Sequence, residues 1–161
     1  MTEKHLFQSG RLNRLTLKNR IMVAPMTRIS ASVDGVPGDR MKHYYERFAR
    51  GGFGTIITEG LYIDEAWSQT YAFQAGLVNS PQVAGWRAIT DGVHQHGGKI
   101  IAQLMHAGAI SQGNIYRSDT LAPSAVQPRG EPRGFYYGPG HYSLPAALTD
   151  EQVQQHTDRF P

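Results

Sequence analysis

The sequence of 161 residues contains no cysteine. This absence excludes disulfide bonds, thiolate nucleophiles and zinc sites built on cysteine. Long apolar runs are also missing, because none approaches the roughly 20 residues that a membrane-spanning helix requires. The first five residues lack the apolar core of a secretory signal. We therefore expect a cytoplasmic protein that makes no use of membranes and needs a bound cofactor for any redox chemistry.

An excess of charge of one sign is missing as well. The chain has 16 Lys and Arg against 13 Asp and Glu, which gives a formal net charge of +3, and the basic residues do not form runs. Nucleic-acid binding normally requires a concentrated basic patch. A nucleic-acid partner is therefore not expected.

Several catalytic signatures are absent. The sequence contains no Gly-x-Gly-x-x-Gly, no Gly-x-x-x-x-Gly-Lys-Ser/Thr and no Gly-x-Ser-x-Gly. These are the main sequence signatures of Rossmann dinucleotide-binding proteins, P-loop proteins and α/β-hydrolases, so none of these three classes is favoured. His94 and His96 stand two apart in a predicted helix and point to different faces. Asp64 and Glu65 are adjacent in a predicted loop, which favours a solvated turn. No metal site is expected from these residues.

What the sequence does contain is an alternation of buried strands and amphipathic helices. Apolar or β-branched runs at 21–26, 53–59 and 99–104 are typical of strands covered on both faces in a parallel sheet, with Gly60 expected at the end of the second. Helical patterns at 39–50 and 80–96 separate them. This order predicts an α/β fold of three strand–helix units, the third helix opening at a capping box at 149–152.

The helical patterns also predict which side chains are buried. Met41, Tyr44, Tyr45 and Phe48 share one face of the first helix, and Val83, Trp86, Ile89 and Val93 share one face of the second. Ser80 is expected to cap the second helix, with Pro81 at its first position. In the third helix, Val153, Thr157 and Phe160 share a face.

Two segments lie outside this alternation. Residues 6–17 have the spacing of a short hairpin, expected to act as a lid or plug. Residues 107–148 are rich in Gly, Pro, Ser and aromatics and are far longer than an ordinary connection. We expect this segment to cover the functional site.

In parallel α/β folds the carboxyl ends of the strands face the ligand. The residues there are 25–28, 59–60 and 103–106. Thr27 offers a hydroxyl donor, Gly60 an unobstructed backbone and Gln103 an amide that donates and accepts, which suits the edge of a flat heteroaromatic ring. Gln103 is expected to be buried and to need such a partner. His106 follows Gln103 by three residues, faces the opposite way and is expected to be structural.

Seven ordered motifs then carry a family resemblance. They are Leu6-Phe7 with Leu17-Lys18-Asn19-Arg20-Ile21, Ala24-Pro25-Met26-Thr27-Arg28, Tyr44-Tyr45, Glu59-Gly60, Ser80-Pro81-Gln82, Gln103-Leu104-Met105-His106-Ala107-Gly108 and Ala122-Pro123-Ser124. In this order the sequence resembles the old yellow enzyme family of FMN-dependent ene-reductases. The resemblance implies a TIM (β/α)8 barrel, of which residues 1–161 would be the amino-terminal portion.

The resemblance also implies roles for particular residues. Pro25, Met26 and Thr27 would line the FMN, and the Thr27 hydroxyl would bond flavin O4 and tune its reduction potential. Gly60 would bring backbone close to the ring, and Gln103 would bind its pyrimidine edge. Among substrate-binding positions, Tyr71 matches a family aromatic, and Met105 stands where many members carry tryptophan.

The activity implied is reduction of the activated C=C bond of α,β-unsaturated carbonyl compounds, with NADPH or NADH as the electron donor. In the family, the carbonyl-binding pair, the proton-donating tyrosine and the FMN phosphate site lie on later strands. A partner is therefore expected to supply the remaining part of the barrel, either a second chain or a continuation of this one. Two alternatives remain: a flavodoxin-like FMN electron carrier, or a non-catalytic barrel fragment acting as an interaction module.

Overall fold

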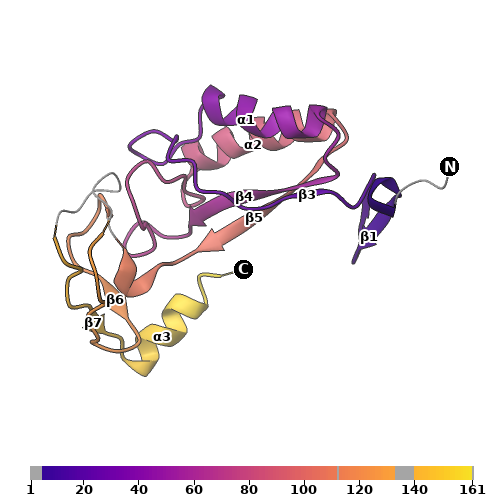
Figure 1. Cartoon of the computed structure of the whole chain (residues 1–161). Helices are drawn as coiled ribbons and strands as arrows, with labels where there is room; N and C mark the ends of the chain where they lie inside the picture. Colours follow the sequence, from indigo (N-terminus) through magenta and orange to yellow (C-terminus); the bar gives the residue numbers. More distant parts are fainter. Residues whose placement is uncertain (1–4, 112, 133–139, 161) are drawn as a thin grey trace.

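The fold is a three-stranded parallel sheet with helices packed on it, seen in a computed structural model that describes residues 5–111, 113–132 and 140–160. The strands are β3 (Met22–Val23), β4 (Thr55–Tyr62) and β5 (Lys99–Met105). The helices that follow them in turn are α1 (Asp39–Arg50), α2 (Ser80–Gln95) and α3 (Asp150–Thr157). Three strand–helix units are thus present, as the alternation predicts (Figure 1).

The order of the strands separates two of the expected architectures. The sheet runs β3-β4-β5, so strands adjacent in sequence are adjacent in space. A flavodoxin-like sheet instead places its first strand between the second and third. The flavodoxin-like alternative is therefore wrong. The order is that of a barrel segment, and among the described residues it is left open, because β5 pairs only with β4.

Two of the strands differ from their expected lengths. β3 is confined to Met22–Val23 because the chain reaches Pro25, which has no N–H to donate to a ladder. β4 does not end at Gly60. After a register shift between Ile57 and Gly60, pairing with β5 resumes and continues to Tyr62.

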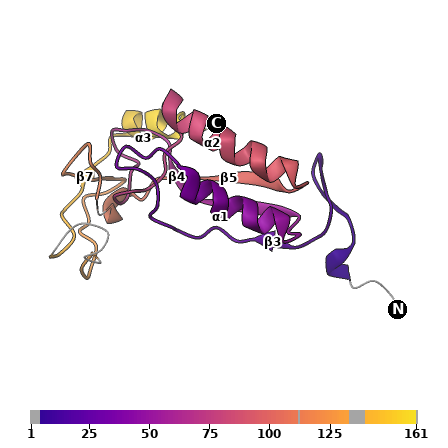
Figure 2. The same cartoon turned by 90° about the horizontal axis from the view of Figure 1, so that it is seen from above.

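The core lies between the sheet and α1 and α2, which run side by side over it (Figure 2). The buried hydrophobic residues that pack together in this core include Val23, Met41, Tyr45, Ala49, Ile56, Leu61, Trp86, Ile89 and Val93. Tyr44 and Phe48 pack at its margin. The predicted stripe of α2 is confirmed except at Val83, which is 43% exposed.

Gln82 takes the buried place that Val83 was expected to hold. Its amide donates to Tyr62 Oη at 2.6 Å and to the Asp34 carbonyl at 2.9 Å, so its polar group is satisfied in the interior. The cap of α2 is also shifted by one residue. Asn79, not Ser80, is the N-cap and accepts a hydrogen bond from Gln82 N at 3.1 Å.

The amino-terminal segment forms the expected hairpin. A 3-10 turn, η1 (His5–Phe7), precedes the antiparallel strands β1 (Gly10–Leu12) and β2 (Leu15–Leu17). The hairpin lies beyond the amino ends of the parallel strands, opposite the end where ligands are expected (Figure 1). Lys18, which follows it, donates to the carbonyls of Ala49 and His96 and so places a cation at the carboxyl ends of both α1 and α2.

The long segment after β5 lies at the carboxyl ends of the strands (Figure 1). Its described part contains the 3-10 turn η2 (Gly108–Ile110) and a short parallel pair, β6 (Leu121–Ala122) and β7 (Ala146–Ala147), while residues 112 and 133–139 lie outside the described residues. The capping box before α3 is confirmed: the Thr149 hydroxyl accepts from Gln152 N, and the Gln152 side chain accepts from Thr149 N. None of the helices described is both long and apolar enough to cross a membrane.

Candidate active site

The segment that leaves β3 presents the first group of expected site residues to solvent. Pro25, Met26 and Thr27 are all exposed, and Met26 is 42% exposed despite its apolar side chain. The phenol of Tyr71, which is buried, donates a hydrogen bond of 3.3 Å to Thr27 Oγ1. Because the Thr27 oxygen accepts this bond, its own proton remains available for another acceptor. The structure therefore brings Thr27 and Tyr71 together.

The buried side chain of Glu59 fixes this segment to the sheet. Glu59, 1% exposed in β4, accepts a hydrogen bond from the backbone N–H of Arg28 at 3.2 Å through Oε2. Its other oxygen accepts from Tyr45 Oη at 3.2 Å, and Tyr45 Oη accepts from Glu59 N at 3.0 Å. The residue after Thr27 is thus fixed to the core of the sheet.

The electrostatics of Glu59 follow from its burial. Desolvation raises the pKa of the Glu59 carboxyl above its ordinary value, and the hydrogen bonds from Arg28 and Tyr45 partly oppose this rise. Burial, and then the nearby Glu59, raise the pKa of the Tyr45 phenol, which stays protonated as a donor. The Arg28 guanidinium stacks over the Tyr44 ring at 4.8 Å.

Sequence reasoning gave Glu59 no role. The signal that could have found it is an acidic residue in an otherwise apolar strand, because a buried carboxylate requires partners. Tyr45 on the inner face of α1 is the partner that the helical pattern had already predicted to be buried.

Gly60 and Met105 form a second group. They lie on neighbouring strands, and a Cβ added to Gly60 would come 2.3 Å from Met105 Sδ, so the glycine allows the thioether to lie across β4. The Gly60 carbonyl accepts from Gln74 Nε2 at 2.9 Å. The structure brings together one residue expected to bind cofactor and one expected to bind substrate.

Gln103 is opposite Gly60 in the register of β4 and β5. Its side chain is exposed, so the expectation that it is buried is wrong for this chain. The reason is that β5 is the open edge of the sheet, with no further strand beside it among the described residues. The backbone is nevertheless fixed, since Gln103 N donates to Thr58 Oγ1 at 3.0 Å.

These residues can be tested for their fit to a flat heteroaromatic cofactor. Such a ring needs apolar contact on its face and polar groups at its edge. Pro25 and Met26 supply exposed apolar surface, Thr27 an oriented hydroxyl, and Gln103 an exposed amide. The donor set fits the isoalloxazine ring of FMN, whose O4 accepts and whose pyrimidine edge both donates and accepts.

Of the residues that the sequence predicts to be solvated, the two histidines at the carboxyl end of α2 are exposed and Asp64 is not. His94 and His96 are exposed, as expected. Asp64 is not in a solvated turn: its side chain is 13% exposed, accepts from Trp67 N at 2.7 Å and pairs with Arg159 at 3.2 Å, both through Oδ1. The turn folds back on itself and is covered by the region around α3, which sequence adjacency alone does not show.

Comparison with known proteins agrees with this geometry. The family model of the NADH:flavin oxidoreductase / NADH oxidase family matches residues 5–161. The chain is 36% identical over 124 residues to an NADH oxidase of Thermoanaerobacter brockii, covering 77% of this chain and 19% of the relative. It is 39% identical over 125 residues to an NADPH dehydrogenase of Listeria welshimeri, covering 75% of this chain and 35% of the relative.

A solved structure gives the same result. The old yellow enzyme homologue from Zymomonas mobilis superposes with a TM-score of 0.84 at 34% identity, over 97% of this chain and 43% of that one. The chain therefore spans less than half the length of these relatives. With a family model that matches nearly every residue and a superposition of the same extent, the chain belongs to the NADH:flavin oxidoreductase / NADH oxidase family, whose members include old yellow enzyme homologues.

Proposed function

We propose that this chain is the amino-terminal part of an FMN-dependent ene-reductase barrel, which reduces activated C=C bonds of α,β-unsaturated carbonyl compounds with NADPH or NADH. The observation that carries the proposal is Thr27, an exposed residue in the segment after β3 whose hydroxyl accepts a hydrogen bond from the buried Tyr71. An oriented donor at this place suits flavin O4.

The FMN, when bound, supplies the transfer of a hydride from NAD(P)H to the β-carbon of the substrate. The residues of this chain bind and orient. Thr27 would donate to O4, Pro25 and Met26 would contact the ring, and Gln103 would pair with the pyrimidine edge. Glu59 keeps Thr27 in place through the N–H of Arg28.

The substrate side would be formed by Tyr71 and Met105. Met105 lies over Gly60, and its thioether is flexible and polarizable, so it would make a softer pocket wall than the tryptophan of many family members. The Tyr71 ring is buried behind Thr27, which favours a role in orienting the Thr27 hydroxyl in addition to any contact with substrate.

The remaining strands would come from a second chain or from a continuation. Two features of this chain support that requirement. The β5 edge is open, and exposed apolar side chains such as Met22 and Met26 lie near the sheet. A closed barrel removes both features.

The test is complementation. The chain expressed alone should be colourless and aggregation-prone, because an open strand edge invites pairing with other chains. Mixed or co-expressed with the matching carboxyl-terminal part of the Zymomonas mobilis homologue, it should give a yellow protein that oxidises NADPH with 2-cyclohexenone as acceptor.

Two results would count against the proposal. A yellow, soluble monomer with one FMN per 161-residue chain would show that no further strands are needed. A reassembled barrel that binds FMN but does not reduce enones would favour the non-catalytic fragment.

A further inference from the structure

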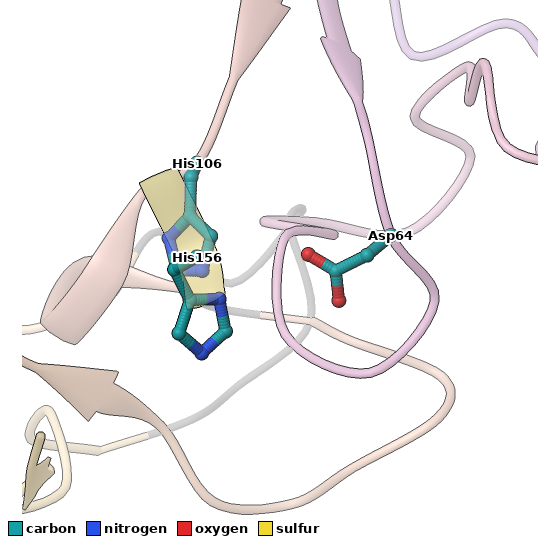
Figure 3. Close-up of side chains that lie close together, drawn as sticks. All are labelled: Asp64, His106 and His156. Atoms are coloured by element: carbon teal, nitrogen blue, oxygen red, sulfur yellow. The ribbon is translucent and has the colours of Figure 1, made fainter. Parts of the chain in front are cut away.

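Three segments distant in sequence meet beside the carboxyl end of β5. Asp64 lies in the loop after β4, His106 follows β5, and His156 lies in α3. One potential ligand atom from each lies within 4.8 Å of the other two. Figure 3 shows the two imidazole rings close together, with the Asp64 carboxylate directed toward them.

Each of the three residues also has a buried polar atom without a partner. Asp64 Oδ2, His106 Nε2 and His156 Nδ1 are buried and form no hydrogen bond with any described residue. A buried polar atom without a partner is costly, so three of them together point to an occupant that satisfies all three. None of these residues belongs to the proposed FMN site.

We propose that Asp64, His106 and His156 bind a Zn²⁺ ion. Two imidazole nitrogens and one carboxylate oxygen are a ligand set that zinc accepts, with a fourth position left for water. Ligand atoms in a tetrahedral site lie about 3.3 Å apart, so no separation would need to close by more than about 1.5 Å on binding, which is within reach of side-chain rotation.

Burial is the main cause that lowers the pKa of both His106 and His156, which favours their uncharged forms. A metal ligand must in addition be unprotonated at the coordinating nitrogen, and for His106 this requires a change of tautomer.

Two contacts would change when the ion binds. Gly108 N donates to His106 Nδ1 at 3.0 Å, which leaves the imidazole proton on Nε2. Coordination through Nε2 moves that proton to Nδ1, and the Gly108 N–H must turn away. Metal–ligand bonds are much stronger than one hydrogen bond, so the exchange favours the ion.

The second contact is the pair between Arg159 and Asp64 Oδ1. It leaves Oδ2 as the coordinating oxygen, but the guanidinium repels a divalent ion at short range. Replacing Arg159 should therefore tighten zinc binding, the opposite of what a general loss of structure would do.

The site has an entry path and a structural consequence. His106 and His156 line an apolar groove of about 540 Å³, together with Leu121, Val153 and Phe160. α3 has no buried residue of its own. An ion held by His156 and the two residues near the strand ends would fasten α3 to the sheet.

The experiment is equilibrium dialysis of the metal-free reassembled protein, in which this chain is complemented by the carboxyl-terminal part, against Zn²⁺, with the bound metal measured by mass spectrometry. One ion per chain is expected. Replacing a residue that only hydrogen-bonds to a metal ligand typically weakens metal binding by roughly 10- to 100-fold. His156→Ala and Asp64→Asn remove ligands themselves, so each should weaken zinc binding by more than this. His94→Ala and Asp91→Asn, both exposed on α2, should leave it unchanged, and Arg159→Gln should tighten it.

Nitrogen NMR of the histidines gives an independent readout. The His106 proton should move from Nε2 to Nδ1 on addition of Zn²⁺. A chain that binds no zinc, with the tautomer of His106 unchanged, would overturn the proposal. It would favour a buried water that accepts from His106 Nε2 and donates to the other two atoms. Equal loss of binding in the α2 control variants would overturn it too.

Discussion

The carboxylate of Glu59 and the backbone N–H of Arg28 are joined by a hydrogen bond of 3.2 Å. This bond links the buried centre of β4 to the exposed segment that carries Thr27. It makes the position of a surface hydroxyl depend on a carboxyl group that is 1% exposed. The stability of the chain and the geometry of the proposed FMN site therefore share one side chain.

Replacing Glu59 with Ala should lower the free energy of unfolding by about 2 kcal/mol, because Tyr45 Oη and Arg28 N lose their acceptor and an unsatisfied group costs about 1–3 kcal/mol. Urea denaturation of the reassembled protein measures this change. Glu59→Gln keeps one acceptor and should cost less. Equal losses in the two variants would mean that packing, and not hydrogen bonding, accounts for the effect.

The pH dependence of stability follows from the same carboxyl. Its pKa is raised in the folded chain, so the folded state binds a proton more tightly than the unfolded state. The stability contributed by this group is fully present below the ordinary pKa of 4.5 and is lost as pH rises through the raised value. Subtracting the Glu59→Gln unfolding curve should isolate this fall, and a flat difference across that interval would contradict it.

The strand that holds Glu59 also contains a steric relationship that a double-mutant cycle can measure. Gly60→Ala should destabilise the protein by about 1–3 kcal/mol, since the new Cβ would approach Met105 Sδ to 2.3 Å. Met105→Ala in the same chain should recover most of that loss. Gly10→Ala is the control, because the nearest atoms to its Cβ position belong to the Arg20 side chain and lie at an ordinary contact distance of 3.4 Å or more. Additive losses in the double variant would show that the two positions are independent.

The alternation of elements was predictable because buried parallel strands and amphipathic helices leave distinct patterns. The three strands, the two core helices, the hairpin and the capping box at Thr149 all follow from such local signals. The burial predicted for Val83 was wrong, and Gln82 is buried in its place, because hydrophobic spacing does not reveal that Tyr62 and Asp34 satisfy a buried amide.

The site was predictable only in part, for a similar reason. Strand ends could be located from the sequence, so Thr27, Gly60 and Gln103 could be singled out. The support from Glu59, the contact of Tyr71 with Thr27 and the convergence of Asp64 with His106 and His156 depend on tertiary packing across 31 to 92 residues of chain. The exposure of Gln103 depends on a neighbouring strand that the described residues lack.

In the reassembled flavoprotein, Gln103→Ala should weaken FMN binding about two- to tenfold for each hydrogen bond lost, since one such bond contributes about 0.5–1.5 kcal/mol. The sheet should survive, because the bond to Thr58 uses the Gln103 backbone. Fluorescence titration of FMN gives the affinity. Gln95→Ala, at an exposed position on α2, is the matched control. Unchanged affinity in Gln103→Ala would remove its proposed role.

The Thr27 hydroxyl is the group whose loss should affect the two half-reactions in opposite directions. A donor at flavin O4 stabilises the reduced ring more than the oxidised ring, because the reduced ring carries more negative charge. Thr27→Ala should therefore lower the reduction potential of bound FMN, by about 20–60 mV if the difference is 1–3 kcal/mol. Reduction by NADPH should become slower and reduction of the enone faster.

Two further variants separate the hydrogen bond from packing. Thr27→Val keeps the shape of the side chain and should behave like Thr27→Ala. Tyr71→Phe removes the phenol that donates to Thr27 Oγ1, so the hydroxyl is less firmly oriented and the potential should fall by a smaller amount. Stopped-flow measurement of both half-reactions, with a spectroscopic titration of the potential, is the test. Equal slowing of both half-reactions at an unchanged potential would mean that Thr27 only packs against Tyr71, whereas opposite changes require the Thr27 proton to reach the flavin.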